Sequence, residues 1–403
     1  MHVLPRHKLG KNNEFTKRLN RQTALDLIRR GASNRAELSR LMGLSPQSLS
    51  NIFADLEAAG LLSSSGKSYG GKGQPPTNYE IAADCGYGIG LHIDDGYCCT
   101  LAVDFAFEVR AVRRKPLRAA SAEALYREAR DAVRQTIAQA KAPKRKIWGI
   151  GVASPRLTNE RSNDMWRVED RLWAEVSAFG LDRRLAEDFD AMVVAENDAN
   201  TGALGEKLFG CGRNLKSFCY VFLGHGLGCG HIQDGALYRG AWGNAGEIGR
   251  ILVPVGNNYV HLETILSVDS LLDRIDGGRT GGLSDLESLA RDNPEAVNLW
   301  LREAAPRLRW LISTLENTAD PESIVIGGYL PADLLRRLIA GIEPLHHTIA
   351  ARDSRDAPRV QAGVLDRDVV AMGAAAMPIL ATLDPEPNAG WAITGAVLDI
   401  YPA

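Results

Sequence analysis

The segment AENDANTGALGE, residues 195–206, constrains the fold more than any other stretch of the chain. The apolar run 192–195 predicts a short buried strand, and Asn197 and Asp198 follow it in a turn. Asn200 is a candidate N-cap for a helix that begins after it. Ligands of open α/β sheets lie beyond the carboxyl ends of the strands, so this turn is a candidate binding site. A helix cap without a ligand has the same pattern, and this segment alone leaves both interpretations open.

Four further motifs follow this segment along the chain. They are GHGLGCG at 224–230, DGALYRGAWGNAGEIG at 234–249, LET at 262–264 and IVIGGYLP at 324–331. Together with ENDAN at 196–200, they resemble the ROK family, which groups sugar-responsive repressors, open reading frames and sugar kinases. The resemblance covers most of the chain. It implies an α/β fold of two lobes, of the actin-like and sugar-kinase type, with a sugar bound in the cleft between them.

The resemblance also implies which residues contact the ligand. Asn197, Asp198, Glu247 and Glu263 would hydrogen-bond the hydroxyl groups of a sugar ring. Arg250 stands where the family has a histidine. A guanidinium group forms bidentate pairs with carboxylates and phosphates, so Arg250 is a candidate contact for an anionic or acetylated group of the ligand.

The same region predicts no bound metal, and no cofactor is expected. In the family, a structural zinc is held by the histidine that is replaced here and by three cysteines that follow it, whereas residues 251–262 contain no cysteine. His225 and His261 alone cannot supply the four ligands of a structural zinc. The six cysteines of the chain have no regular spacing and are interpreted as small buried residues.

The first 80 residues carry an excess of positive charge. They contain twelve Lys and Arg against six Asp and Glu, a net charge of +6, whereas the whole chain has a net charge of −2. A basic segment on an acidic body indicates a polyanionic partner. A solvated basic surface is the alternative.

Helix signals in this basic region predict a winged helix-turn-helix domain over residues 1–82. Apolar residues at helical spacing predict a first helix within residues 16–30. Asn34 is predicted to cap a second helix, which ends at a glycine turn at Gly43, and Ser45 is predicted to cap a third. This order resembles the DNA-binding domain of the repressors in the family. A helical protein-interaction domain is the alternative.

The partner expected for this domain is double-stranded operator DNA. The residues predicted to contact it are Arg35, Gln47, Ser48, Ser50, Asn51, Lys67, Lys72 and Gln74. Amides and hydroxyls at the start of a recognition helix can read base edges in the major groove, and lysines of the wing can contact phosphates. Gln74 stands where the family's repressors usually have an arginine, which weakens the case for minor-groove contact.

The remaining chain is expected to form the two lobes. Residues 83–200 are assigned to the first lobe together with a C-terminal helix over 366–383, and residues 201–365 to the second. Three antiparallel strands are predicted within 86–117, followed by a helix over 121–142. The residues after the C-terminal helix have no assigned role.

Three functions fit these features. The first is a sugar-responsive regulator that represses carbohydrate-metabolism genes as a homodimer or homotetramer. The second is a ROK-type sugar kinase with a fused DNA-binding domain, in which Asp198 would be the catalytic base. The third is a DNA-binding scaffold with a decayed cleft, which the joint retention of the predicted ligand-binding residues disfavours.

The first hairpin favours the regulator over the kinase. Alignment with the phosphate-binding Asp-x-Gly-x-Thr pattern of the kinases places His92, Asp94 and Gly96 at its three positions. The added carboxylate repels phosphate, and the hydroxyl group is missing. We therefore assign no catalytic residue.

No membrane partner is expected from the sequence. No apolar run approaches the ~20 residues of a membrane span. The N-terminus lacks the apolar core of a signal peptide, so a cytoplasmic location is the expectation.

Overall fold

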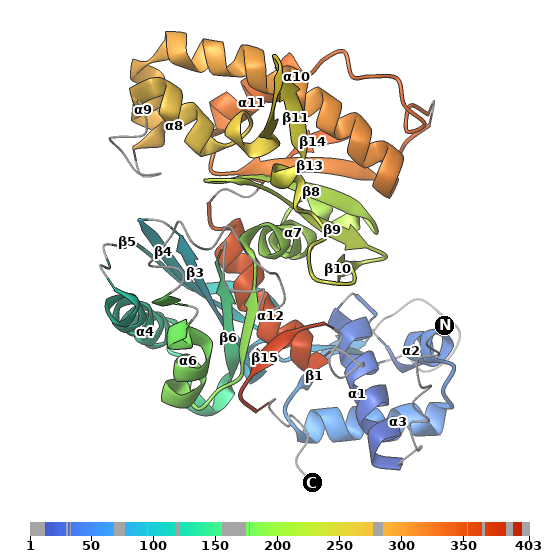
Figure 1. Cartoon of the computed structure of the whole chain (residues 1–403). Helices are drawn as coiled ribbons and strands as arrows, with labels where there is room; N and C mark the ends of the chain where they lie inside the picture. The colour runs from blue at the N-terminus through green and yellow to red at the C-terminus, as the bar shows by residue number, and fades with distance from the viewer. Residues whose placement is uncertain are drawn as a thin grey trace, which may run out of the picture.

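The computed structural model shows an N-terminal unit and two lobes, each lobe built on one β-sheet (Figure 1). It describes residues 13–29, 31–32, 34–67, 77–94, 96–117, 119, 121–154, 175–176, 178–276, 285–352, 354–364, 367–383 and 390–396. Within these ranges, no helix is both long enough and apolar enough to cross a membrane.

The N-terminal unit has three helices followed by a two-stranded antiparallel hairpin, in the predicted order. The elements are α1 (Asn13–Arg29), α2 (Arg35–Met42), α3 (Pro46–Ala58), β1 (Leu62–Lys67) and β2 (Thr77–Ile81). The predicted caps are confirmed: Asn34 Oδ1 accepts from the Glu37 N–H at 3.0 Å, and Ser45 Oγ accepts from the Ser48 N–H at 3.1 Å. Gly43 ends α2 in the left-handed conformation that favours glycine.

The first lobe contains a six-stranded sheet in the order β15-β7-β6-β3-β4-β5. Its strands are β3 (Tyr87–Asp94), β4 (Tyr97–Asp104), β5 (Val109–Pro116), β6 (Ile147–Ala153), β7 (Val193–Glu196) and β15 (Ala392–Thr394). Helices α4 (Ala122–Ala140) and α6 (Leu181–Phe189) cover one face, and α12 (Val369–Leu383) covers the other (Figure 1). The three predicted antiparallel strands and the helix after them are confirmed.

The second lobe contains a five-stranded sheet in the order β10-β9-β8-β13-β14. Its strands are β8 (Phe218–Leu223), β9 (Leu227–Gln233), β10 (Ala236–Tyr238), β13 (Ser323–Gly328) and β14 (Val360–Ala362). Helix α7 (Asp198–Phe209) lies under this sheet in the view of Figure 1. The helices above it are α8 (Val268–Asp276), α9 (Leu286–Asp292), α10 (Pro294–Ala319) and α11 (Ala332–Gly341). A separate hairpin is formed by β11 (Leu252–Val255) and β12 (Asn258–His261).

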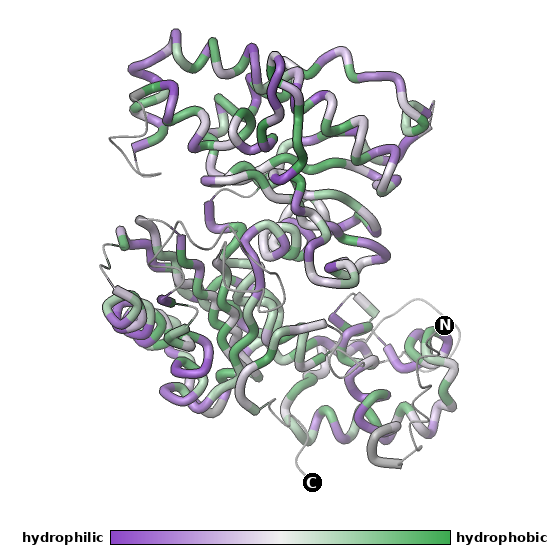
Figure 2. The backbone as a smooth tube through the Cα atoms, in the orientation of Figure 1, coloured by the Kyte–Doolittle hydropathy of each residue, from purple (hydrophilic) through white to green (hydrophobic). Residues whose placement is uncertain are grey.

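Helix α12 lies between the two lobes and touches both at close range (Figure 1). On the side of the first lobe, a β-carbon at Gly90 of β3 would lie 2.1 Å from the Ala371 carbonyl oxygen. On the side of α7, a β-carbon at Gly373 would lie 1.9 Å from the Thr201 carbonyl oxygen. Only glycine allows backbones to approach this closely. Figure 2 shows hydrophobic residues along α12 and the strands it covers.

The first helix and the last strand among the described residues both contact α12 or the sheet that it covers. Gln22 of α1 donates a buried hydrogen bond from Nε2 to the Thr382 carbonyl of α12 at 2.7 Å. Strand β15, in the C-terminal region that had no predicted role, pairs antiparallel with β7. Helix α7 runs across residue 200, where the sequence placed the boundary between the lobes.

Replacement of Gly373 by alanine is expected to lower the free energy of unfolding by about 2 kcal/mol, because the added β-carbon must displace the Thr201 carbonyl. Gly341→Ala is the matched control. Its β-carbon would lie 3.1 Å from the methyl group of Ala305, so we expect a loss below about 1 kcal/mol. Urea unfolding of both variants measures the difference. Equal stabilities would contradict a tight contact between α7 and α12.

Candidate functional site

A cavity of about 400 Å³ opens where the N-terminus of α7 meets the second lobe. All of the residues predicted to bind ligand line it: Asn197, Asp198, Glu247, Arg250 and Glu263. Asp94, at the end of β3, adds a carboxylate from the first lobe. Several other polar residues line the cavity without having been predicted from the sequence, namely His225, Thr264, Ser267, Asp269, Ser270 and Asp273.

The turn after β7 is both a helix cap and part of the cavity wall. Helix α7 begins at Asp198, and Asn197 is its N-cap, with its Oδ1 accepting from the Asn200 N–H at 2.7 Å. The prediction that Asn200 caps the helix was therefore wrong. Asn200 lies buried inside the first turn, where its Nδ2 donates to Glu196 Oε1 at 3.0 Å. The two interpretations of this segment are thus compatible, because the capping residues also line the cavity.

Asp198 titrates near neutral pH. Burial is the main cause, and the nearby carboxylate of Asp94 adds to it; together they raise the pKa of Asp198 to about 7. The Ala199 N–H donates to Asp198 Oδ1 at 2.8 Å and opposes this shift. Near pH 7 this carboxyl group can therefore either accept a hydrogen bond from a ligand hydroxyl or donate one to it.

Arg250 and Glu263 form an ion pair on the cavity wall, with Nη1 and Oε1 2.8 Å apart. Arg250 lies in the short helix Ile248–Arg250, and Glu263 lies in the short helix Leu262–Thr264. The Arg250 side chain is 47% exposed, so the pair contributes no more than about 1 kcal/mol of stability. A ligand can therefore rearrange it at little energetic expense.

The positions that align with the kinases' phosphate hairpin hold a buried hydrogen-bond network instead. Tyr329 follows β13, and its hydroxyl donates to Asp94 Oδ2 at 2.6 Å. The same hydroxyl lies 3.1 Å from His92 Nε2. Burial lowers the pKa of His92 to about 3, so its ring is neutral and Nε2–H donates to the tyrosine oxygen. Sequence reasoning missed Tyr329, although it directly follows the diglycine of the IVIGGYLP motif.

The glycine loop between β8 and β9 carries a second polar pair. His225 Nδ1 lies 2.7 Å from Asp269 Oδ1 of α8, and the His225 ring packs edge-on against Tyr329. The His225 side chain therefore connects α8 with the network around Tyr329.

A further ion pair connects the lobes beside the turn after β7. Arg239 Nε donates to Glu196 Oε2 at 2.6 Å, and its guanidinium stacks over the Trp391 ring at 4.6 Å. Trp391 directly precedes β15, so the C-terminal strand takes part in this contact. No sequence signal joins these three residues, which lie far apart along the chain.

The predicted DNA-contacting residues differ in their surroundings. Gln47, Ser48 and Asn51 lie exposed on α3, whereas Ser50 is half-buried and donates to the Pro46 carbonyl at 3.0 Å. Lys67 ends β1, and Lys72 and Gln74 lie outside the described residues.

Arg35 makes contacts within the N-terminal unit. Its guanidinium lies over the rings of Phe53 and Tyr79, and its Nη2 donates to the Tyr79 hydroxyl at 2.6 Å. It packs α2 against α3 and β2 rather than standing free on the surface. The contact of Arg35 with DNA stays a prediction from the sequence.

Asp198→Asn is expected to stabilise the protein most at high pH. The pKa of Asp198 is higher in the folded protein than in the unfolded chain, so between about pH 4 and pH 7 the folded state holds a proton that the unfolded state has released. As the pH rises through this interval, the free energy of unfolding of the wild type therefore falls relative to that of the variant. Above about pH 7 the difference between the two proteins stays constant. Denaturant unfolding of both proteins at about pH 5 and about pH 8 measures the change. A pH-independent difference would contradict the raised pKa.

Tyr329→Phe is expected to lower the free energy of unfolding by about 1–3 kcal/mol, because it removes the hydroxyl that bonds to Asp94 and His92. Tyr220→Phe is the matched control. The Tyr220 hydroxyl is equally buried and has no hydrogen-bond partner among the described residues, so its removal should be neutral or stabilising. Urea unfolding compares the two variants, and a loss at Tyr220 as large as that at Tyr329 would refute the network.

Comparison with known proteins agrees with this architecture. The profile described as "ROK family" matches residues 90–379. The xylose repressor of Caldicellulosiruptor bescii is 25% identical over 339 residues, which cover 78% of this chain and 84% of the repressor. A crystal structure of a ROK family transcriptional regulator, described as a homologue of the E. coli MLC protein, has a TM-score of 0.68 at 21% identity, covering 91% of this chain and 96% of that one. A ROK hexokinase from Thermus thermophilus has a TM-score of 0.55 at 20% identity, covering 73% of this chain and 98% of the hexokinase. The chain belongs to the ROK family.

Proposed function

We propose that this protein is a sugar-responsive transcriptional regulator that represses carbohydrate-metabolism genes. One observation carries the proposal: the polar residues predicted to bind a sugar line one cavity. Beside it, Tyr329 hydrogen-bonds to His92 and Asp94, two positions that align with the phosphate hairpin of the kinases. The similarity to proteins named xylose repressor supports the same function.

The charge of the cavity favours a neutral sugar as the effector. Its carboxylates are Asp94, Asp198, Glu247, Glu263, Asp269 and Asp273. Arg250 is the one Lys or Arg among the described residues that line the cavity, and it is paired with Glu263. Carboxylates accept hydrogen bonds from sugar hydroxyls but repel phosphates and carboxylates. We therefore prefer a neutral sugar to the anionic ligand that Arg250 suggested from sequence.

The N-terminal unit is proposed to bind operator DNA as a winged helix-turn-helix. Helix α3 would enter the major groove, where the exposed side chains of Gln47, Ser48 and Asn51 can reach base edges. The hairpin of β1 and β2 would be the wing. A homodimer or homotetramer is proposed, because two recognition helices then match two half-sites at a fixed spacing.

A sugar kinase is the second candidate, and the cavity disfavours it. Asp198 has a pKa suited to a general base. Phosphoryl transfer also requires positive charge around the γ-phosphate, whereas Arg250 is the one Lys or Arg among the described residues that line the cavity, and it is paired with Glu263. The similarity to the hexokinase shows a shared fold and supports no activity.

Fluorescence anisotropy on DNA from upstream of the protein's own and neighbouring genes tests the regulator. At fixed salt and with random DNA as control, one neutral sugar from a panel that also includes sugar phosphates and N-acetyl sugars should change operator affinity by about tenfold. Glu247→Gln should abolish this response and leave operator binding without sugar intact. Asn51→Ala should weaken operator binding by about 1–3 kcal/mol and leave sugar binding, measured by calorimetry, unchanged.

Two results would contradict the proposal. Operator affinity that stays unchanged in saturating bound sugar would exclude a sugar-responsive regulator. ADP release that depends on a sugar and is lost in Asp198→Asn would establish the kinase instead.

A further inference from the structure

A cluster of two cysteines and one histidine lies in the second lobe, and one of its members, Cys229, also lines the cavity of the proposed sugar site. The Sγ atoms of Cys219 and Cys229 and a ring nitrogen of His231 all lie within 4.8 Å of one another. Cys219 and Cys229 are 1% and 2% exposed, and His231 is half-buried. Among the described residues, this is the one group of three such side chains close enough to hold a metal ion.

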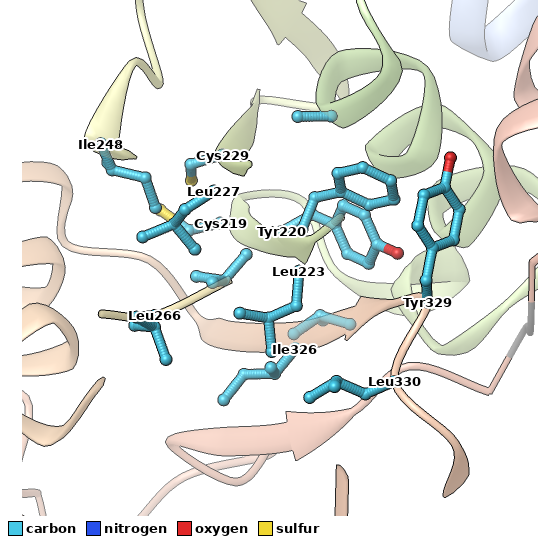
Figure 3. Packing of buried hydrophobic residues seen from close by; sticks show 14 of the residues in the cluster. Cys219, Tyr220, Leu223, Leu227, Cys229, Ile248, Leu266, Ile326, Tyr329 and Leu330 are labelled. Carbon is cyan, nitrogen blue, oxygen red and sulfur yellow. The ribbon is translucent and has the colours of Figure 1, made fainter. Parts of the chain in front are cut away.

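Strand pairing fixes this arrangement. Cys219 of β8 lies directly opposite His231 of β9 in the antiparallel register. Cys229 lies two residues before His231 on β9, so its side chain projects from the same face of the sheet. Figure 3 shows the sulfur atoms of the two cysteines side by side, next to Ile248. The three donors are therefore held by the backbone of a central strand pair and not by a loop.

The spacing suits tetrahedral coordination. Cys219 Sγ and His231 Nδ1 are 3.4 Å apart. A tetrahedron with Zn–S of about 2.3 Å and Zn–N of about 2.0 Å has an edge of about 3.5 Å between these ligands. Thiolate and imidazole donors select zinc-like ions over magnesium and calcium, which prefer oxygen.

We propose that Cys219, Cys229 and His231 bind one Zn²⁺ ion, with water as the fourth ligand. The half-buried edge of His231 provides the route for the ion and for that water. This proposal replaces the sequence-based expectation of no metal. It concerns a different place from residues 250–262, which lack the cysteines of the family's zinc site.

The ion would stabilise the turn at 246–250, which carries two of the residues proposed to bind the sugar, Glu247 and Arg250. The Cys229 N–H donates to the Gly246 carbonyl at 2.9 Å, and a β-carbon on Gly246 would lie 1.7 Å from the Cys229 carbonyl oxygen. Glu247 directly follows Gly246, and Arg250 lies three residues further on. A metal ion bound to Cys229 therefore holds β9, the strand that packs against this turn, in a fixed position.

Titration of the metal-free, reduced full-length protein with Co²⁺ tests the site. We expect one equivalent to bind with the near-ultraviolet thiolate-to-cobalt charge-transfer band and the visible bands of tetrahedral Co²⁺, and Zn²⁺ to displace it. Cys219→Ala and His231→Gln should bind at least about tenfold more weakly. Cys98→Ala is the matched control, because Cys98 is also a buried strand cysteine but lies on β4 of the first lobe.

The outcomes distinguish this site from the proposed sugar function, because metal binding is measured without sugar or DNA. Absence of the charge-transfer band in the folded wild type would overturn the proposal. So would unchanged binding in both Cys219→Ala and His231→Gln. If Cys219→Ala fails to fold, His231→Gln decides the question, since His231 is half-buried and its replacement leaves the cysteine core intact.

Discussion

The rest of the structure depends on the close approach of helix α12 to both lobes. Gly90 and Gly151 let the backbone of α12 lie directly on the first sheet, and Gly373 lets α7 cross it at the same distance on the other side. Contacts of this kind leave no room for sliding, because any displacement drives backbone atoms into one another. The N-terminus of α7 is thereby held at the end of β7. This is why Asn197 and Asp198 face the cavity rather than solvent.

Polar contacts also join the two lobes across the cleft. Asp94 and His92 meet Tyr329 across the cleft, and Glu196 meets Arg239 beside it. Most of these groups are buried, so separating any pair would leave a polar group without compensation in a poorly hydrated place. By contrast, the pair of Arg250 and Glu263 is partly exposed and inexpensive to break. The cavity therefore combines a stiff frame with one side that can adapt to a ligand.

Sequence reasoning predicted the elements well where the signal was local. Caps at Asn34 and Ser45 and the strands of the first hairpin depend on neighbouring residues, and the structure confirms them. Sequence reasoning did not predict contacts between distant segments. No sequence pattern indicates the hydrogen bond between Tyr329 and Asp94, because that bond depends on how the two sheets face each other. The family motifs did identify residues that the structure gathers around one cavity, among them Asn197, Glu247 and Glu263.

The attachment of the N-terminal unit has a mechanical consequence. Leu25 of α1 lies in the same continuous core cluster as Ala375 of α12, and Gln22 bonds to the last turn of that helix. The core between α1 and α12 is continuous, so the N-terminal unit is an arm fixed to that helix. A rotation of α12 would therefore carry α3 with it (Figure 1). Two such arms in an oligomer would convert a change of angle in the cleft into a change of distance between two helices.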